Sequence, residues 1–318
     1  MDKYIGLDIG GTKCAAVLGT LDGNVNIEDK IVFETKGKTP DEILARFSEF
    51  IGKKLSNCKI AGIGIACGGP LDSKSGVVRK PPSLPLWDNI PVVKYFEDKF
   101  GIPTFLRNDA DACAVAEWQY GAGAGSENMI FLTFGTGFGA GLILGGRLYS
   151  GTSDGAGEIG HVRMTRSGPV GYGKEGAAEG YCSGGGIRRL ALIELERRKQ
   201  RGAYPEAFIK SVGGEDNVSA KTLAEGARRG DKFCLCIYKK SGEMLGRVLS
   251  ILIDVLNPEK IVIGGVFMRS HDLLLPHAMR IIKKEALSHT ASTCQILPAK
   301  LGELIGDASA LAIAKGVL

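Results

Sequence analysis

The chain has 318 residues, of which 44% are hydrophobic and 24% charged, and its formal net charge is +5. These values are ordinary for a globular protein and exclude a disordered or fibrous chain. Lysine and arginine are scattered, so we expect no nucleic-acid partner. With no signal peptide and no long apolar segment, we expect no membrane attachment, a cytoplasmic location and reduced thiols at the eight cysteines.

The first motif is a glycine turn between two strands. Residues 4–7 and 14–18 predict strands, and Gly10-Gly11-Thr12 joins them. The backbone N–H groups of such a turn can approach phosphate oxygens that a Cβ would keep away. Asp8 is placed to face a hydrated Mg²⁺ held by phosphates, and Lys13 adds a positive charge. The alternative is an ordinary hairpin with an exposed aspartate.

The next elements extend this start into a mixed sheet. Residues 31–34 predict a third, antiparallel strand, and Thr39-Pro40-Asp41-Glu42 has the pattern of a capping box that begins a helix. Residues 59–67 predict a buried strand of the parallel kind. It runs into Gly68-Gly69-Pro70, a loop at the carboxyl end of a strand, where open α/β sheets bind ligands.

The segment Pro81–Pro91 contains four prolines and therefore cannot be a helix or a central strand. One interpretation is a surface crossover. The other is a rim above a sugar-sized pocket, in which Trp87 is an apolar wall and Ser83 and Asn89 donate or accept hydrogen bonds.

Asn108-Asp109 stands between a predicted strand at 104–107 and a predicted helix at 110–119. Asp109 there is either the N-cap of the helix or a general base at the end of an inner strand. The run Gly121–Gly125 is typical of a hinge or linker, and we place a domain boundary near residue 118.

A second glycine loop, residues 135–141, lies between predicted strands at 129–134 and 142–144. It matches neither a P-loop nor a dinucleotide motif. Two strand–turn–strand loops about one domain apart fit a nucleotide held by two related halves, each binding phosphates with backbone N–H groups.

The middle of the chain carries candidate sugar ligands in glycine-rich loops. Glu158, His161 and Glu179 are suited to binding hydroxyls, although a solvated loop with a structural histidine is an equal alternative. The remaining pattern predicts helices at 187–198, 219–228, 232–256, 272–287 and 305–315, and strands at 260–263 and 295–297. Gly264-Gly265 forms a third glycine turn.

In this order the motifs resemble the ROK family of sugar kinases and repressors, within the actin-like ATPase superfamily. The resemblance rests on DIGGTK at 8–13, GIGIACGGP at 62–70, ND at 108–109, GTGFGAG at 135–141, GEIGH at 157–161, Glu179 and IGG at 263–265. It implies an α/β fold of two RNase H-like domains with mixed sheets around a central cleft. The expected domains are 1–117 with a C-terminal helix at 304–318, and 118–303.

The resemblance also implies roles for individual residues. The implied activity is ATP-dependent phosphorylation of a hexose hydroxyl, glucose O6 first, in a homodimer that uses ATP and Mg²⁺. The alternative substrate is N-acetylmannosamine or another N-acetylhexosamine. Asp109 is the implied catalytic base, and the implied sugar ligands are Gly69, Ser83, Asn108, Asp109, Glu158, His161 and Glu179. The implied nucleotide ligands are Asp8, Gly10, Gly11, Thr12, Lys13, Gly135, Thr136, Gly137, Gly264 and Gly265.

The sequence departs from the family pattern at three places. The family commonly binds zinc with the histidine of GEIGH and three cysteines, but the cysteine positions here hold Val170, Tyr172 and Ala177. A structural zinc needs about four ligands, so we expect none. Ser83 replaces the usual asparagine of the sugar loop, and Asp111 stands where asparagine is common. Seven residues precede Asp8, so we expect no repressor-type DNA-binding domain.

Overall fold

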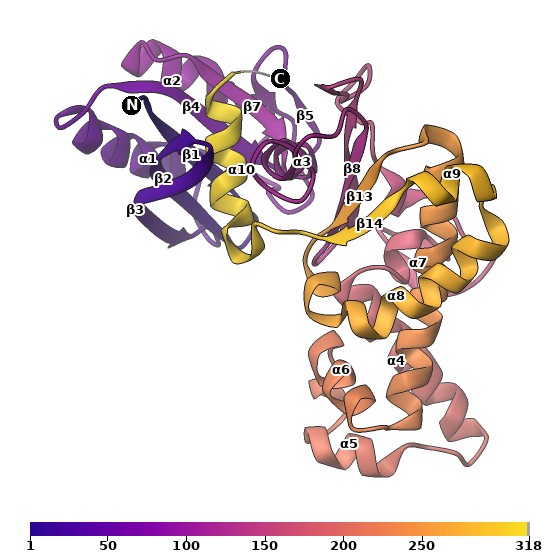
Figure 1. Cartoon of the computed structure of the whole chain (residues 1–318). Helices are drawn as coiled ribbons and strands as arrows, with labels where there is room; N and C mark the ends of the chain where they lie inside the picture. Colours follow the sequence, from indigo (N-terminus) through magenta and orange to yellow (C-terminus); the bar gives the residue numbers. More distant parts are fainter. Residues whose placement is uncertain (317–318) are drawn as a thin grey trace. The chain divides into compact units, whose positions relative to one another are not determined.

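Two five-stranded mixed sheets organise the chain (Figure 1). The computed structural model describes residues 1–316. The chain divides into two compact units. The first comprises Met1–Phe131, Gly141–Gly157 and the chain from Ala299 onward, and the second comprises Leu132–Ala140 and Glu158–Pro298. The predicted mixed α/β class is confirmed.

The first sheet has the strand order β3-β2-β1-β4-β7. Its strands are β1 (Lys3–Ile9), β2 (Lys13–Asp22), β3 (Asn24–Glu34), β4 (Ile60–Cys67) and β7 (Thr104–Asn108). The three N-terminal strands are antiparallel, as predicted, whereas β1, β4 and β7 run parallel. Ile9 pairs with Cys67, and Cys67 pairs with Asn108. The register therefore brings the carboxyl ends of three parallel strands to one edge.

The two faces of this sheet are covered in different ways. Ile5, Leu7 and Ile9 point into a core that contains α1 (Pro40–Leu55) and α2 (Val92–Phe100). The opposite face receives α3 (Asp109–Tyr120) and α10 (Ile305–Ala314). The alanine-rich α10 lies so close that a Cβ on Gly64 would be 2.1 Å from the Ala310 carbonyl oxygen. Glycine in β4 is thus required by direct helix-to-strand backbone packing.

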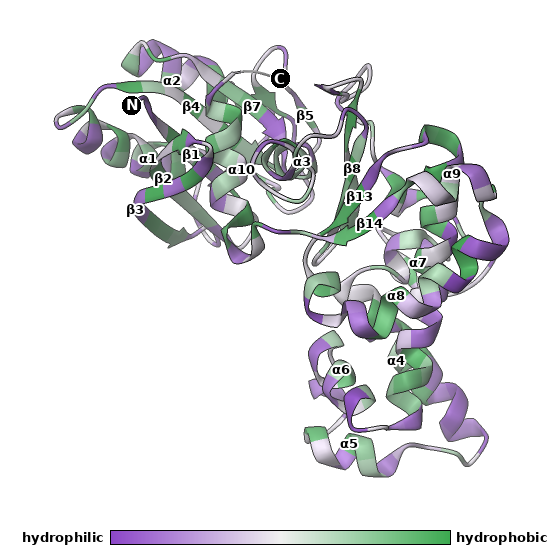
Figure 2. Ribbon diagram, viewed as in Figure 1, coloured by the Kyte–Doolittle hydropathy of each residue, from purple (hydrophilic) through white to green (hydrophobic). Residues whose placement is uncertain are grey.

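The second sheet has the order β10-β9-β8-β13-β14, and the division between the units passes through β8 and β9. Its strands are β8 (Met129–Phe134), β9 (Phe138–Leu144), β10 (Arg147–Leu148), β13 (Lys260–Ile263) and β14 (Gln295–Pro298). Hydrophobic residues dominate β8 and β13 (Figure 2), as expected for buried strands.

The remaining elements are short strands and helices outside the two sheets. The short strand pairs are β5 (Leu71–Asp72) with β6 (Val77–Val78) and β11 (Val170–Gly171) with β12 (Lys174–Glu175). The helices of the second unit are α4 (Gly184–Gln200), α5 (Glu206–Val212), α6 (Ala220–Arg228), α7 (Lys232–Leu256), α8 (Val266–Glu285) and α9 (Ser288–Thr293). The 3-10 turns are η1 (Ile159–His161), η2 (Ala178–Gly180), η3 (Glu215–Asn217) and η4 (Gly302–Leu304). Within residues 1–316 no helix has both the length and the apolar character that crossing a membrane requires.

The predicted helix at 232–256 is confirmed with the same bounds, whereas the one predicted at 272–287 begins earlier. The helix α8 starts at Val266, directly after the third glycine turn, and bends at Ser270, whose φ of −138° is not helical. The backbone bend interrupts the apolar periodicity of α8. The sequence pattern therefore predicted only the part of the helix after the bend.

The glycine run at 121–125 is not a free linker. The Gly121 and Gly123 N–H groups both donate to the Glu117 carbonyl oxygen, at 3.0 and 2.9 Å, and the Trp118 indole donates to the Ser126 carbonyl at 2.7 Å. These bonds hold the run against the end of α3, and the first unit continues to Phe131. The compact units have other bounds than the predicted domains, whose boundary lay near residue 118, and α10 packs in the first unit.

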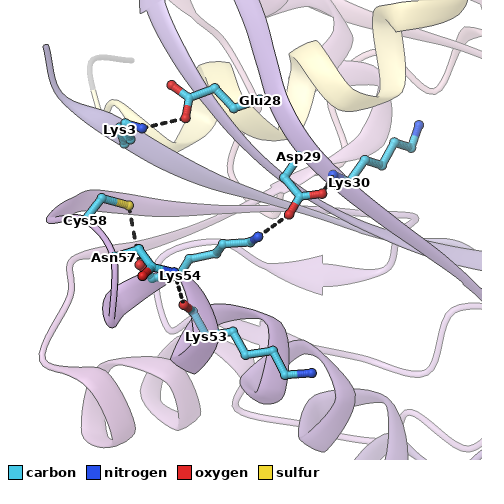
Figure 3. A network of polar contacts seen from close by, with 8 residues as sticks. All are labelled: Lys3, Glu28, Asp29, Lys30, Lys53, Lys54, Asn57 and Cys58. Carbon is cyan, nitrogen blue, oxygen red and sulfur yellow. Dashed lines mark hydrogen bonds and ion pairs between the residues drawn. The ribbon is translucent and has the colours of Figure 1, made fainter.

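Charged pairs on the surface of the first unit join β3 to its neighbours (Figure 3). Lys3 pairs with Glu28 at 2.5 Å, and Lys54 of α1 pairs with Asp29. Exposed pairs of this kind contribute little to stability, on the order of 0–1 kcal/mol each. The first unit therefore owes its cohesion mainly to the apolar core.

Candidate active site

The carboxyl edge of the first sheet gathers the residues predicted to hold phosphate and to act as base. Gly10-Gly11-Thr12 follows β1, Gly68-Gly69 follows β4, and Asp109 follows β7. The turn is held by Thr35, whose Oγ1 donates to the Gly10 carbonyl at 2.6 Å and whose N–H donates to the Thr12 carbonyl at 3.0 Å. Both bonds use carbonyl groups of the turn and none of its N–H groups.

Asp109 is the first residue of α3 and is not its N-cap. The cap is Asn108, whose side-chain oxygen accepts a hydrogen bond from the Ala110 N–H at 2.9 Å. Asp109 Oδ1 accepts from the same N–H at 2.8 Å, and the side chain retains an exposed surface. Partial desolvation by the surrounding protein raises the pKa of the Asp109 carboxyl, and the hydrogen bond from the Ala110 N–H opposes this shift. With capping done by its neighbour, Asp109 is available for chemistry.

Asp8 lies near two further acidic groups. Burial, followed by the charges of Asp109 and Asp307, raises the pKa of the Asp8 carboxyl to about 6, and Lys13 and Lys30 oppose the shift. Lys30 Nζ lies 2.6 Å from Asp307 Oδ2, which neutralises part of the acidic cluster. In the described residues no three carboxylates, histidines or cysteines are arranged to hold a metal. One carboxylate beside a turn predicted to bind phosphate nevertheless suits Mg²⁺, which takes its other ligands from phosphate and water.

Three of the predicted sugar ligands, Gly69, Ser83 and Asn108, lie at this edge. A Cβ on Gly69 would be 3.1 Å from Asn108 Nδ2, and one on Gly11 would be 2.6 Å from the Ser83 Cβ. The interpretation of Trp87 as a pocket wall was wrong: its side chain is 1% exposed and packs in the core of the first unit. Successive turns at Leu84 and Trp87 direct both side chains inward, whereas Leu86 between them is 61% exposed.

The second unit brings three glycine segments together. The Gly184 N–H donates to the Gly135 carbonyl at 2.8 Å, and a Cβ on Gly265 would lie 2.2 Å from the Phe134 carbonyl oxygen. The loop at 135–137 thus lies between the start of α4 and the start of α8, and the predicted residues Gly135, Thr136, Gly137, Gly264 and Gly265 form one cluster. Helix N-termini favour anions, which is consistent with the phosphate contact predicted for this loop.

Sequence reasoning missed the start of α4. Its N-cap is Ser183, and three glycines follow it. A Cβ on Gly185 would lie 3.6 Å from the Thr136 carbonyl oxygen and 3.2 Å from Arg189 Nη1. The Arg189 Nε atom is buried without a hydrogen-bond partner. The run Ser183-Gly-Gly-Gly was a usable signal, because a capping residue followed by glycines exposes helix N–H groups.

Glu179 connects two parts of the second unit. Its Oε1 accepts from the Tyr172 N–H at 2.9 Å, and its Oε2 accepts from the Phe138 N–H at 3.3 Å. Glu158 is the N-cap of η1 and His161 its last residue, and the Cβ of Glu179 is 3.5 Å from where a Cβ on Gly160 would lie. The three predicted sugar ligands of this unit therefore lie close together, next to the glycine loop at 135–137.

The residues that replace the cysteines do not fit a zinc site. Val170 and Tyr172 belong to the β11–β12 hairpin, and the His161 ring packs edge-on against the Tyr172 ring, with centroids 5.7 Å apart. Only His161 of the usual four ligands remains, and zinc needs about four. The expected absence of zinc stays a prediction.

We expect metal analysis of the purified protein to find well under one zinc per chain, because three thiolate ligands are missing. Treatment with a chelator should likewise leave the unfolding midpoint unchanged. A stoichiometric zinc signal that disappears in His161→Ala would contradict this expectation.

Asp111 is buried in the first turn of α3, two residues after the candidate base. Its side chain is 3% exposed, and its Oδ2 accepts a hydrogen bond from Ser150 Oγ at 2.6 Å. Burial raises the pKa of this carboxyl to about 7; Ser150 and Arg107 oppose the shift, and the charges of Asp154 and Asp109 add to it. The folded protein therefore holds this proton at pH values where the unfolded chain has released it.

The free energy of unfolding should accordingly fall as the pH rises from about 4 to about 7, by on the order of 4 kcal/mol at most from Asp111. Asp111→Asn removes the titrating group. The variant should therefore be more stable than wild type at pH 8, and the difference between the two free energies of unfolding should be smaller at pH 4. Denaturant unfolding of both proteins at the two pH values measures this. Equal pH dependence in the two proteins would show that Asp111 ionises normally.

Comparison with known proteins agrees with this arrangement. A sequence profile of the ROK family matches residues 4–317. A glucokinase of Thermotoga maritima is 30% identical over 317 residues, covering 98% of this chain and 97% of the relative. A Streptomyces griseus ROK family glucokinase, solved in complex with glucose and AMPPNP, has a TM-score of 0.79 and 28% identity, covering 99% of both chains.

Repressors are among the relatives too. A xylose repressor of Bacillus spizizenii is 26% identical, and the match covers 94% of this chain and 73% of the repressor. The glycine loops, the Asn108-Asp109 junction and the match over nearly the whole length lead to one conclusion: this chain belongs to the ROK family.

Proposed function

We propose that this ROK protein transfers the γ-phosphate of ATP to a hexose hydroxyl, with glucose O6 as the expected acceptor. The observation that carries the proposal is the sheet edge of the first unit, where Asp109 follows β7 beside the glycine turn that follows β1. The similarity to glucokinases at 28–30% identity supports it.

The glycine segments are the proposed phosphate ligands. Gly10, Gly11 and Thr12 form the proposed phosphate turn of the first unit, and Lys13 adds charge. Gly135, Thr136 and Gly137 form that of the second; the Gly135 N–H donates to the Gly137 carbonyl at 3.1 Å, so the donors proposed there are the N–H groups of Thr136 and Gly137. Asp8 is the proposed carboxylate for Mg²⁺, which neutralises phosphate charge when bound. Gly264 and Gly265, beside the start of α8, are proposed to lie against the adenosine.

Asp109 is the proposed general base. A sugar hydroxyl is a weak nucleophile, and a carboxylate within hydrogen-bond reach can take its proton as the oxygen bonds to the γ-phosphorus. The bond from that phosphorus to the bridging oxygen breaks, and ADP leaves. Surrounding protein raises the pKa of Asp109, which makes it a better proton acceptor than an ordinary aspartate.

The remaining sugar hydroxyls are proposed to bind the polar groups at the edges of the two units. Gly69, Ser83 and Asn108 are the candidates in the first unit. Glu158, His161 and Glu179 are those in the second.

A panel of hexoses and N-acetylhexosamines, each with ATP and Mg²⁺ and read by ADP release, tests the proposal. Turnover with glucose well above the sugar-free rate is the expected result, and Asp109→Asn is the matched control for contaminating kinases. Turnover with N-acetylmannosamine alone would establish the alternative substrate, which Ser83 in place of the usual amide keeps open. Binding of a sugar without ADP release on any substrate would overturn the kinase proposal and favour a sugar sensor.

The proposed assembly is a homodimer. Exposed apolar side chains on α7, α8 and the start of α9 support it: Ile251, Val255, Met279 and Leu287 are between 42% and 72% exposed. Light scattering coupled to size-exclusion chromatography gives the mass directly, and a mass of one chain at micromolar concentration would contradict it.

A further inference from the structure

Tyr172 occupies a turn position that does not suit a bulky residue. The strands β11 and β12 are joined by Tyr172-Gly173, with φ values of 45° and 72°. Both residues of this two-residue hairpin turn lie at positive φ, where asparagine and glycine are favoured. Tyr172 is nevertheless present, and the residue is 61% exposed. Neither the conformation of the turn nor packing in a core therefore explains why a tyrosine stands at this position.

The ring of Tyr172 has one aromatic partner, and that partner is a candidate sugar ligand. The rings of Tyr172 and His161 lie 5.7 Å apart with an interplanar angle of 83°, the edge-to-face geometry that aromatic pairs prefer. Lys174, on the second strand of the hairpin, donates from Nζ to the His161 carbonyl at 2.8 Å. The hairpin thus contacts His161 at both its ring and its main chain.

The same turn also reaches the second candidate ligand. The Tyr172 N–H donates to Glu179 Oε1 at 2.9 Å, so the turn lies between His161 and Glu179. Because this bond comes from the backbone, it depends on the turn conformation and not on the ring. The ring and the N–H of one residue therefore have separable roles, towards His161 and Glu179 respectively.

We infer that Tyr172 is a positioning residue for the sugar site: its ring fixes the orientation of the His161 imidazole, in a loop where the usual cysteine ligands of a zinc ion are replaced. This inference rests on the proposed function, since it takes His161 as a sugar ligand. An exposed imidazole that rotates freely loses entropy when it binds a hydroxyl, and a ring packed against it beforehand reduces that loss.

Two substitutions separate the ring from the turn. Tyr172→Asn removes the ring but adopts positive φ readily, so the hairpin and the bond to Glu179 remain. Tyr172→Phe keeps the ring and loses only the hydroxyl. Histidine ring resonances in sugar-free protein, with the His161 signal identified by its loss in His161→Ala, report the packing directly. We expect the His161 signal to move in the Asn variant and to stay near the wild-type position in the Phe variant.

Steady-state kinetics then tests the consequence. The Asn variant should raise the sugar KM by about 3- to 10-fold, the range that an aromatic pair supplies. Its kcat should stay within about twofold, because Asp109 and the phosphate loops are unchanged, and the Phe variant should behave like wild type. A merely structural role would lower the unfolding midpoint of the Asn variant without this split between KM and kcat.

An unmoved His161 signal in the Asn variant overturns the inference, and so does a moved signal with an unchanged KM. Failure of the proposed function looks different, because then the wild-type protein itself turns over no sugar. In that event calorimetric sugar affinity replaces KM, and equal affinity in the wild-type and Asn proteins overturns the inference as well.

Discussion

Asp109→Asn is expected to lower kcat by about 10²- to 10⁴-fold while sugar binding persists. Asparagine preserves the shape of the side chain and its hydrogen bond with the Ala110 N–H, but it cannot accept the proton of the sugar hydroxyl. Because Asn108 caps α3, the substitution should leave the helix intact. Single-turnover kinetics with the preferred sugar, together with calorimetric sugar binding, measures the two effects separately.

Asp98→Asn is the matched control. Asp98 is exposed on α2, where it pairs with Lys94, so the same change of chemical group should leave kcat unaltered. If Asp109→Asn kept more than a tenth of the wild-type kcat, the base would be another group.

The second large effect is on stability and concerns Glu117. This side chain is fully buried at the end of α3, and its carboxylate accepts three backbone hydrogen bonds. The donors are the N–H groups of Ala122 at 2.8 Å, Lys300 at 3.1 Å and Leu301 at 2.8 Å. One carboxylate thus holds the glycine run after α3 and the segment of chain that leads into α10.

Glu117→Ala should lower the free energy of unfolding by about 3–5 kcal/mol, because three buried N–H groups lose their acceptor and a cavity remains. Glu117→Gln keeps one acceptor oxygen and should cost roughly half as much. Denaturant unfolding monitored by fluorescence measures both. Glu49→Ala, at an exposed position of α1, is the control and should stay within about 0.5 kcal/mol of wild type. A loss below about 1 kcal/mol in Glu117→Ala would show that water replaces the carboxylate.

Local chemistry in the sequence determined much of the fold. The capping box at Thr39 and Glu42 forms as predicted, and α7 has the predicted bounds. The three glycine turns were visible as glycine pairs between apolar strands. These features depend on near neighbours in the chain, so their signals lie within a few residues of one another.

The choice between alternatives at single residues needed the tertiary structure. The sequence left Asp109 as a cap or a base, and Asn108 proved to be the cap. The segment around Trp87 was interpreted either as a surface crossover or as the rim of a pocket with Trp87 as its wall, and the fold instead buries Trp87 in the core. Glycines at 121–125 are typical of a linker, yet here they are bound to a buried glutamate. Each outcome depends on which groups approach from distant parts of the chain.

Sequence alone determined that this is a mixed α/β protein with glycine loops, an acidic strand end and no cysteines at the usual zinc positions. The structure decided which residues meet: Gly184 with Gly135, Glu179 with Phe138, and Tyr172 with His161. Turns and caps follow from local backbone preference, which a sequence displays. The other contacts join segments that lie up to tens of residues apart in the sequence. They follow from the packing of the whole unit, so a local sequence pattern cannot predict them.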